Sequence, residues 1–530
     1  MLNRTSPDDN LLVKTTGGRI WTGAEASPFV EAILVEKGRV IASGALSSIE
    51  SQLPGSLKVL EIGQGELAIP GIIDSHLHLA EGAKALRTVQ LTDVNSQELF
   101  EKRLASFSAT LPEGSWLTGR GWDHTLWGGE LPTWEWLEGL EPPRPVFLAR
   151  LDGHMALVSQ LAMELAGIDE STPDPPGGCI VKDIQGRPTG ILKDTAMELV
   201  QPPKREGGLL KQDFISGAKH LASLGITGAH DMWLPMEQLS TLRETCEKGE
   251  LPIRLRVAIP AHERADLVAY VHEHGCGNEW LQWDMIKIFL DGSLGSHTAW
   301  MLQDYTDAPG DRGLVVTNSE NLKRQVMECN AANLKVLVHA IGDAAVRNAL
   351  DVFEECGPGQ YRIEHAQHIH PEDLPRFSEL GVISCIQPIH LADDARWLED
   401  VLGEERARWS YPWATMKDAG ATLAGGTDWP IAPASPWLNL HTAITRETND
   451  GKNPGGWFPE QGIGLEYALK MMTQGSAMAS GEGDCLGKLA PGFWADMAIL
   501  NRDIFELPSS SLLEVEAVST WVAGKQTEMQ

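Results

Sequence analysis

The sequence has few of the features that mark exported, membrane-spanning or disulfide-rich proteins. Its 7 cysteines are scattered, and none forms a CxxC pair, which argues against both a disulfide framework and a zinc-thiolate site. No stretch approaches the roughly 18 uninterrupted apolar residues of a membrane span, and residues 1–10 are polar and lack the apolar core of a secretion signal. We therefore expect a soluble, cytoplasmic chain without membrane contact.

Basic residues are scarce relative to acidic ones. The 43 lysines and arginines face 73 aspartates and glutamates, which gives a formal net charge of -30. Such a charge repels nucleic acid and anionic membranes, so neither is an expected partner, and no basic patch stands out against it. A small-molecule substrate is the expected partner, and a homodimer is compatible with the composition. The length of 530 residues predicts more than one domain.

The two ends of the chain share one sequence pattern. From Leu11 to Ile69, short β-rich runs are broken by glycine and polar residues, and similar runs return at Asp496 to Leu500 and at Ala517 to Val522. We expect residues 1–68 and 483–530 to form one small β-sandwich domain.

The middle of the chain alternates apolar, strand-like runs with helical stretches. The runs are Ile69 to Asp74, Gly225 to Asp231, Ile253 to Ile259, Met285 to Asp291, Lys335 to His339, Arg362 to His365, Val382 to Gln387 and Thr422 to Asp428. This alternation predicts an α/β fold, a (β/α)8 TIM-like barrel over residues 69–482.

A long segment separates the first two of these runs. It is far too long for one βα connection, so we expect an inserted domain after the first barrel strand, over residues 81–224. It is rich in tryptophan, namely Trp116, Trp122, Trp127, Trp134 and Trp136. These indoles could contact an apolar or aromatic substrate, or they could form the insertion's own core.

Histidines follow the first barrel run. In Ile73-Asp74-Ser75-His76-Leu77-His78 the two imidazoles stand at i and i+2, and side chains at that spacing point the same way from a strand. Two ligands delivered together from a buried strand indicate a metal site.

Three further polar residues stand at the ends of later runs. These are His339, His365 and Asp428, which fall where barrels of this kind place their chemistry. Imidazole and carboxylate are ligands that zinc and similar ions favour. Each residue alone could be structural, Asp428 as a turn cap for example, but together they favour a divalent metal site.

Lys287 lies inside an apolar run, where an unpaired ammonium group is unfavourable. One explanation is a lowered pKa and a nucleophilic amine that takes up carbon dioxide to form a metal-bridging carbamate. The other is a simple ion pair with a neighbouring acid such as Asp291.

Several motifs together resemble those of the amidohydrolase superfamily, and the chain is most similar to its amidohydrolase family 3 branch, which includes N-substituted formamide deformylases. The motifs are Pro70 to His78, Gly121-Trp122-Asp123, Gly225-Ile226-Thr227, Asp291 to Ser296, His339 to Asp343, Gly426 to Pro430 and Gly487 to Gly492. The resemblance covers nearly the whole chain. Two departures concern substrate recognition, because His297 and Ala344 stand where arginine is common in the family.

The resemblance implies a site and a reaction. One divalent metal, zinc above all, would bind His76, His78 and Asp428, and a second would bind His339 and His365. Carboxylated Lys287 would bridge them, although one-metal sites also occur in the family. Weaker candidates for substrate or supporting contacts are Trp122, Asp123, His154, His230 and Asp291.

The implied activity is hydrolysis of non-peptide carbon–nitrogen bonds in amide or formamide-like substrates by metal-activated water, with Asp428 orienting the water and moving its proton. Two alternatives stay open. The same site could serve a deaminase or a cyclic-amide hydrolase, and the fold could also carry a non-catalytic binding protein.

Overall fold

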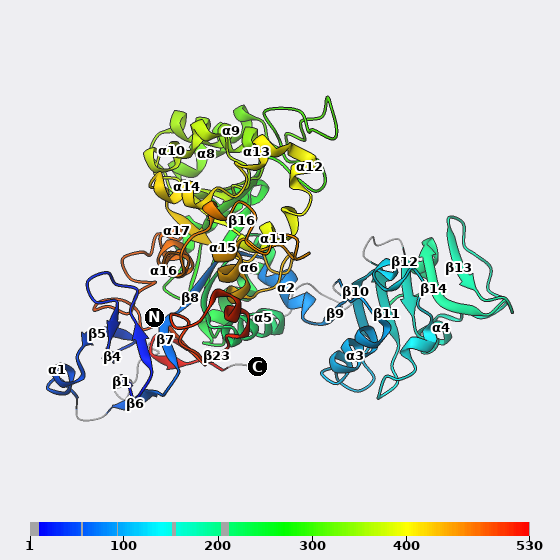
Figure 1. The fold of residues 1–530 in the computed structure, drawn as a ribbon, viewed down its shortest axis with the longest axis horizontal. Helices are drawn as coiled ribbons and strands as arrows, with labels where there is room; N and C mark the ends of the chain where they lie inside the picture. The colour runs from blue at the N-terminus through cyan, green and yellow to red at the C-terminus, as the bar shows by residue number, and fades with distance from the viewer. Residues whose placement is uncertain (1–9, 55–56, 93, 151–154, 203–210, 529–530) are drawn as a thin grey trace. The chain divides into compact units, whose positions relative to one another are not determined.

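The computed structural model describes residues 10–54, 57–92, 94–150, 155–202 and 211–528. The chain divides into two compact units (Figure 1), the larger made of Met1–Ala80 with Leu209–Gln530 and the smaller of Glu81–Gly208. Helix α5 (Lys211–Ser223), which lies inside the expected insertion of residues 81–224, groups with the larger unit.

An eight-stranded parallel sheet forms the centre of the larger unit. Its strands are β8 (Ile72–Leu77), β15 (Ile226–Asp231), β16 (Arg254–Pro260), β17 (Leu281–Phe289), β18 (Lys335–Ala340), β19 (Tyr361–His365), β20 (Ile383–Ile386) and β21 (Leu423–Gly425), paired in chain order. The first and last strands approach each other, because Asp428 N donates to His76 O at 2.7 Å and His78 N donates to Trp429 O at 2.7 Å. The predicted (β/α)8 barrel is confirmed.

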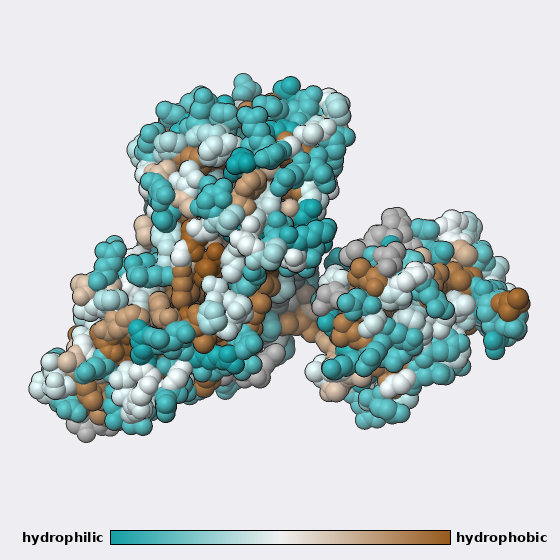
Figure 2. Space-filling view, viewed as in Figure 1, coloured by the Kyte–Doolittle hydropathy of each residue, from teal (hydrophilic) through white to brown (hydrophobic). Residues whose placement is uncertain are grey.

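Helices surround this barrel. They are α5, α6 (Met236–Glu247), α7 (Arg264–His274), α8 (Ser319–Ala331), α9 (Asp343–Cys356), α10 (Leu374–Glu379), α11 (Pro388–Asp394), α12 (Leu398–Leu402), α13 (Glu404–Ala407), α14 (Trp413–Asp418), α15 (Pro436–Thr445), α16 (Leu465–Lys470) and α17 (Ser476–Ala479). Helix α2 (Leu79–Ala85) spans the division of the chain between the two units. Helix α9 shows why they pack there, since Val346, Leu350 and Phe353 all lie on its buried face. The surface over α8 to α10 is mostly hydrophilic, whereas hydrophobic surface gathers nearer α15 and α16 (Figure 2).

Both chain ends build the small β domain of the larger unit, as predicted. One sheet has the order β5-β4-β1-β6 and the other β24-β23-β22-β7-β2-β3. The strands are β1 (Leu11–Thr15), β2 (Arg19–Trp21), β3 (Phe29–Val30), β4 (Ala32–Glu36), β5 (Arg39–Gly44), β6 (Lys58–Ile62), β7 (Leu67–Pro70), β22 (Met497–Leu500), β23 (Ala517–Val522) and β24 (Lys525–Gln526), with the short helix α1 (Leu46–Glu50) after β5. Val13, Ile33 and Met497 share one buried core, so residues from the two ends pack together.

The first expected strand, Ile69 to Asp74, is in fact divided between two sheets. Strand β7 ends at Pro70 in the small β domain, and β8 begins at Ile72 in the barrel. Gly71 joins them, and its N–H donates to Asp496 O at 2.8 Å. A Cβ at Gly71 would lie 2.1 Å from Thr227 Oγ1. The apolar pattern gave no sign of this division, because both halves are fully buried.

We expect Gly71→Ala to destabilise the larger unit, because the new methyl group would overlap Thr227 beside the crossing between the two sheets. Overpacking of this kind costs about 1–3 kcal/mol, so thermal unfolding should begin at a lower temperature. Gly464→Ala is the matched control, since nothing lies within 4 Å of a Cβ there. Equal midpoints for both variants would contradict this account of Gly71.

The smaller unit is a sheet with short helices. Its strands, in the order β13-β14-β12-β11-β10-β9, are β9 (Thr88–Gln90), β10 (Leu117–Trp122), β11 (Val146–Arg150), β12 (Met155–Val158), β13 (Gly178–Lys182) and β14 (Pro188–Asp194), with α3 (Gln97–Ser108) and α4 (Gln160–Ala166). Trp122 is fully buried in its core, where the indole N–H donates to Leu148 O at 2.7 Å. Among the described residues of both units, no helix combines the length and apolar character that crossing a membrane requires.

Candidate metal centre

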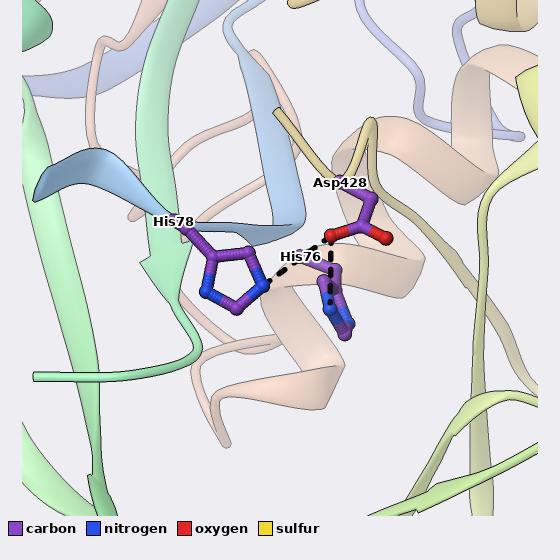
Figure 3. Close-up of side chains that lie close together, drawn as sticks. All are labelled: His76, His78 and Asp428. Atoms are coloured by element: carbon purple, nitrogen blue, oxygen red, sulfur yellow. Dashed lines mark ion pairs between the residues drawn. The ribbon is translucent and has the colours of Figure 1, made fainter. Parts of the chain in front are cut away.

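The barrel brings His76, His78 and Asp428 to one point. His76 Nε2 and His78 Nε2 lie 3.6 and 3.4 Å from Asp428 Oδ1, and the three side chains offer ligand atoms within 4.8 Å of one another. Figure 3 shows both rings directed at the carboxylate. The histidines come from β8 and the residue after it, and the aspartate follows β21, so the junction of first and last strands positions the group.

Asp74 holds the two ligand-bearing segments together. Its carboxylate accepts from Thr427 Oγ1 at 2.6 Å, from Thr427 N at 3.0 Å and from His76 N at 3.1 Å. Burial raises the pKa of Asp74 to about 7 despite these hydrogen bonds. Beyond Thr427, Asp428 adopts a left-handed backbone with φ 59°, a strained conformation of the kind that clusters at functional sites.

A buried chain of polar groups orients His76. Its Nδ1–H donates to Glu364 Oε2 at 2.6 Å, which leaves Nε2 facing Asp428. Arg362 donates to Glu364 Oε1 at 2.9 Å and to Ser75 O at 2.8 Å. Burial alone would raise the pKa of Glu364, but Arg362 and His76 lower it to about 2. Glu364 is therefore a fixed carboxylate, as a partner of a ligating histidine usually is.

A second group of potential ligands uses the same aspartate. His365, His390 and Asp428 offer ligand atoms within 4.8 Å of one another, and His390 Nε2 lies 3.1 Å from Asp428 Oδ2. His365 stands at the end of β19 with φ 74°. His390 was not predicted, because it lies inside helix α11 rather than at a strand end. The only available signal was its position four residues beyond the end of β20 at Ile386.

His339 and Lys287 lie beside these groups but belong to neither. The His339 ring is 4.5 Å from the His365 ring, and its Nε2–H donates to Gly292 O at 3.0 Å. Lys287 is buried, with Nζ 5.2 Å from the Phe289 ring centroid. Burial lowers the pKa of Lys287 to about 8, against the opposing influence of Glu364 and Asp428.

Among the described residues, Asp291 does not form an ion pair with Lys287, which was the alternative explanation for this lysine. Asp291 instead accepts backbone N–H groups from Trp300 at 2.9 Å, Ile341 at 3.0 Å and Gly342 at 2.8 Å. It therefore organises the loops that follow β17 and β18.

The weaker candidates lie in several places. His230 is buried inside the barrel, where its Nδ1 accepts from Arg362 Nη1 at 3.0 Å. In the smaller unit, Asp123 pairs with Arg150 at 2.9 Å, and Trp122 is the core residue described above. His154 lies outside the described residues. Substrate contact by Trp122 or Asp123 stays a prediction.

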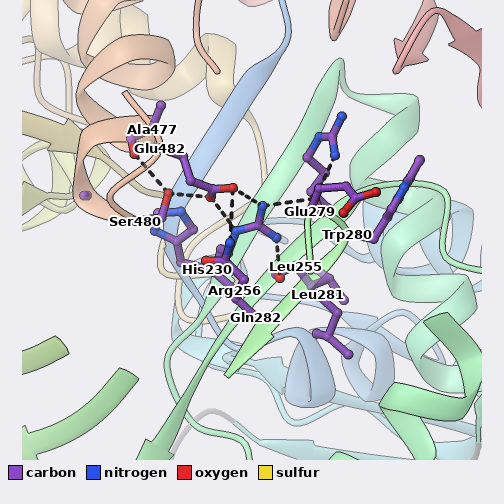
Figure 4. A network of polar contacts seen from close by, with 12 residues as sticks. His230, Leu255, Arg256, Glu279, Trp280, Leu281, Gln282, Ala477, Ser480 and Glu482 are labelled. Atoms are coloured by element: carbon purple, nitrogen blue, oxygen red, sulfur yellow. Dashed lines mark hydrogen bonds and ion pairs between the residues drawn. The ribbon is translucent and has the colours of Figure 1, made fainter. Parts of the chain in front are cut away.

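A second polar network joins strand β16 to the segment that follows α17 (Figure 4). Arg256 donates to both carboxylate oxygens of Glu482, at 2.5 and 2.6 Å, and Ser480 Oγ donates to Glu482 at 2.9 Å. Arg362 Nη1 also donates to Ala479 O at 3.3 Å. The end of α17 and the segment after it are thus held by arginines of two barrel strands, and one of these arginines, Arg362, also supports Glu364.

The donor set fits a divalent metal ion. Among the described residues, two buried atoms of the cluster, His365 Nδ1 and Asp428 Oδ1, have no hydrogen-bond partner, although buried polar atoms almost always have one. Burial lowers the pKa of His76 to about 4 and that of His339 to about 3, so both imidazoles are neutral. Neutral imidazole and ionised carboxylate are the forms that bind such ions.

The aspartate is ionised for an identifiable reason. Burial on its own would raise the pKa of Asp428, but the hydrogen bond from His390 and the neighbouring rings of His78 and His76 hold it well below its usual range. Asp428 therefore offers an ionised carboxylate both to the group with His76 and His78 and to the group with His365 and His390.

We expect Glu364→Gln to weaken binding of a divalent ion by about 10–100-fold, the usual cost of losing the partner of a ligating histidine. The amide keeps the size of the side chain, but it no longer supplies the negative charge that fixes the tautomer of His76. Titration of metal-free protein with zinc would measure the loss. Glu482→Gln is the control, since it removes a buried carboxylate paired with Arg256. Equal affinities in the two variants would contradict the role of Glu364.

A (β/α)8 barrel with histidines and an aspartate at the carboxyl ends of its strands defines a barrel protein with a candidate metal site, at the end where barrel enzymes carry their active sites. The model of the amidohydrolase family matches residues 64–527. The chain therefore belongs to the amidohydrolase family, which confirms the predicted resemblance.

Individual proteins extend this finding. The chain is 33% identical to Protein LONG AFTER FAR-RED 3 of Arabidopsis thaliana, over 96% of this chain and 90% of that protein. It is 24% identical to N-substituted formamide deformylase of Arthrobacter pascens, over 93% and 94% of the two chains. A solved structure of an uncharacterized metal-dependent hydrolase from Pyrococcus furiosus is 31% identical, with a TM-score of 0.70 and coverage of 93% of this chain and 99% of that one.

Proposed function

We infer that this protein is a metal-dependent hydrolase of non-peptide carbon–nitrogen bonds in small amides, formamides included. The observation that carries the proposal is the ionised Asp428, shared between two groups of histidines at the carboxyl end of the barrel. Membership of the amidohydrolase family supports hydrolysis, and the name of the Arthrobacter relative supports formamides as one substrate class.

His76, His78 and Asp428 would hold one ion, for which we propose zinc. His365 and His339 would hold a second ion. His390 is an alternative ligand of this second ion, because its ring nitrogen lies beside the carboxylate of Asp428. When bound, such an ion activates water at neutral pH and polarises the oxygen of a carbonyl group.

The side chains of the site supply the proton transfers. Asp428 accepts a proton from the attacking water at a carboxylate oxygen and delivers it to the nitrogen that leaves. Its low pKa keeps it ionised, which is the form that can accept a proton, and the hydrogen bond from His390 keeps the carboxylate in place. Glu364 holds the ring of His76 through its Nδ1–H.

Lys287 would complete the site as a carbamate. With a pKa of about 8, roughly a tenth of the lysine is the neutral amine at pH 7. The amine nitrogen attacks the carbon of carbon dioxide, a C–N bond forms, and one proton is released to solvent. The product is an anion that can bridge two cations.

The reaction is tested with purified full-length protein loaded with zinc. Hydrolysis of N-substituted formamides should release formate and the free amine in equal amounts. Release of ammonia from ring-amino compounds, without amide hydrolysis, would identify a deaminase instead. Loss of both activities after treatment with a chelator, and recovery on adding zinc, is the expected metal dependence.

A further inference from the structure

A cavity of about 410 Å³ lies in the larger unit at the carboxyl ends of three neighbouring barrel strands. Trp233 follows β15, His262 follows β16, and Phe289 ends β17, while residues of α8 close the outer side. The cavity therefore opens at the same end of the barrel as the metal ligands. Its volume falls within the roughly 300–1,000 Å³ of small-ligand sites.

The cavity shares a wall with the candidate metal centre. Phe289 lines the cavity, its ring lies 4.9 Å from the ring of His339, and Lys287 Nζ lies 5.2 Å from its centroid. Lys287 also lines the cavity. A substrate whose reacting carbon lies at the metal centre could therefore place a substituent in this cavity, on the side of β17.

Aromatic side chains form the wall of the cavity that faces the metal centre. Trp233 meets Phe289 edge to face, with ring centroids 5.5 Å apart, and both side chains are only partly buried. At the rim, the aliphatic Val316 is 51% exposed. Partly open indole and phenyl rings bind flat apolar groups by contact area and ring stacking.

The two arginines of the lining are already paired. Arg264 and Arg324 both form ion pairs with Glu328. A substrate carboxylate would have to compete with Glu328 for these guanidinium groups, whereas a neutral ring meets no such competition.

We propose that this cavity binds a neutral aromatic substituent of the substrate amide, with Trp233 as its specificity-determining residue. The inference rests on the proposed function and adds to it a substrate class and a location. Among the described residues, the indole of Trp233 has ring contacts with His262 and Phe289 but with none of the metal-site histidines. Its replacement should therefore alter binding of the substituent and leave the reacting groups unchanged.

The experiment compares Trp233→Ala with wild-type, zinc-loaded full-length protein on three amides. N-benzylformamide carries the ring on nitrogen, N-methyl-2-phenylacetamide carries it on the acyl side, and N-methylformamide has no ring. We expect KM for the preferred ring-bearing amide to rise at least about tenfold, with kcat and all constants for N-methylformamide within about twofold. The ring-bearing amide whose KM rises in Trp233→Ala identifies which side of the amide enters the cavity.

Trp280→Ala is the matched control, because Trp280 is also a half-buried indole but stands before β17, at the other end of the barrel. Equal changes for ring-bearing and ringless amides in Trp233→Ala, or the same selective change in Trp280→Ala, would overturn the proposal.

A binding measurement separates this inference from the proposed function. Calorimetric titration of the metal-free protein with N-benzylformamide and N-methyl-2-phenylacetamide measures the affinity for each amide without any turnover. Binding by wild type that weakens at least about tenfold in Trp233→Ala would support the cavity even if no amide were hydrolysed, in which case the proposed function alone fails. Equal binding by both proteins, or none by wild type, would reject the cavity as the substituent site.

Discussion

Replacing Asp428 with asparagine should abolish hydrolysis while leaving the fold intact. The carboxylate is the shared element of both histidine groups, with oxygens 3.4 Å from His78 Nε2 and 3.1 Å from His390 Nε2. The amide keeps its shape but has no negative charge and cannot accept the proton of water. Loss of a general base costs about 100- to 10,000-fold, and the loss of a metal ligand adds to this. We expect kcat/KM to fall by at least about 1,000-fold.

The control for this variant is Asp503→Asn in the larger unit. Asp503 is a largely buried aspartate paired with Arg19 at 2.8 Å in the small β domain, so its replacement tests the general cost of removing such a charge. Circular dichroism and thermal unfolding would establish that both variants fold. A well-folded Asp428→Asn with near-normal activity would remove Asp428 from the mechanism.

The predictable part of the site is the part that follows from strand alternation. His76 and His78 stand two residues apart at the end of one buried strand, and Asp428 follows the last strand, so parallel pairing alone brings them together. His365 was predictable for the same reason. His390 was not, because it sits in a helix, and a strand-end rule does not extend to helix positions.

The supporting residues were hidden for a different reason. Glu364 is adjacent in sequence to His365, yet it contacts His76 from another strand, and only the closed barrel brings that pair into contact. The division of one apolar run at Gly71 was equally hidden, since residues buried in two different sheets read alike. The tryptophans of the insertion were compatible with a substrate surface as well as with a core, and the structure places Trp122 in the core. An aromatic substituent site is instead offered by Trp233, a single residue without any local pattern.

Replacing Lys287 with alanine should lower the metal content of the protein. Lys287 is buried among groups that favour its charged form, Glu364 and Asp428, while burial opposes that charge. We propose that Lys287 is converted to a carbamate and that this carbamate bridges two metal ions. Wild-type protein purified without chelator should contain two ions per chain by elemental analysis, and Lys287→Ala should contain one or none.

Lys335→Ala controls for the loss of a buried lysine. Lys335 lies on the next strand, β18, and forms an ion pair with Asp284, so its removal disturbs the barrel without touching the candidate ligands. If both variants lose metal equally, the loss reports barrel stability rather than a bridging ligand. One ion in wild type, unchanged in Lys287→Ala, would define a mononuclear hydrolase in which Lys287 is structural. Protein that holds no ion, even when zinc is supplied, and that hydrolyses no carbon–nitrogen substrate would favour a binding protein on this fold.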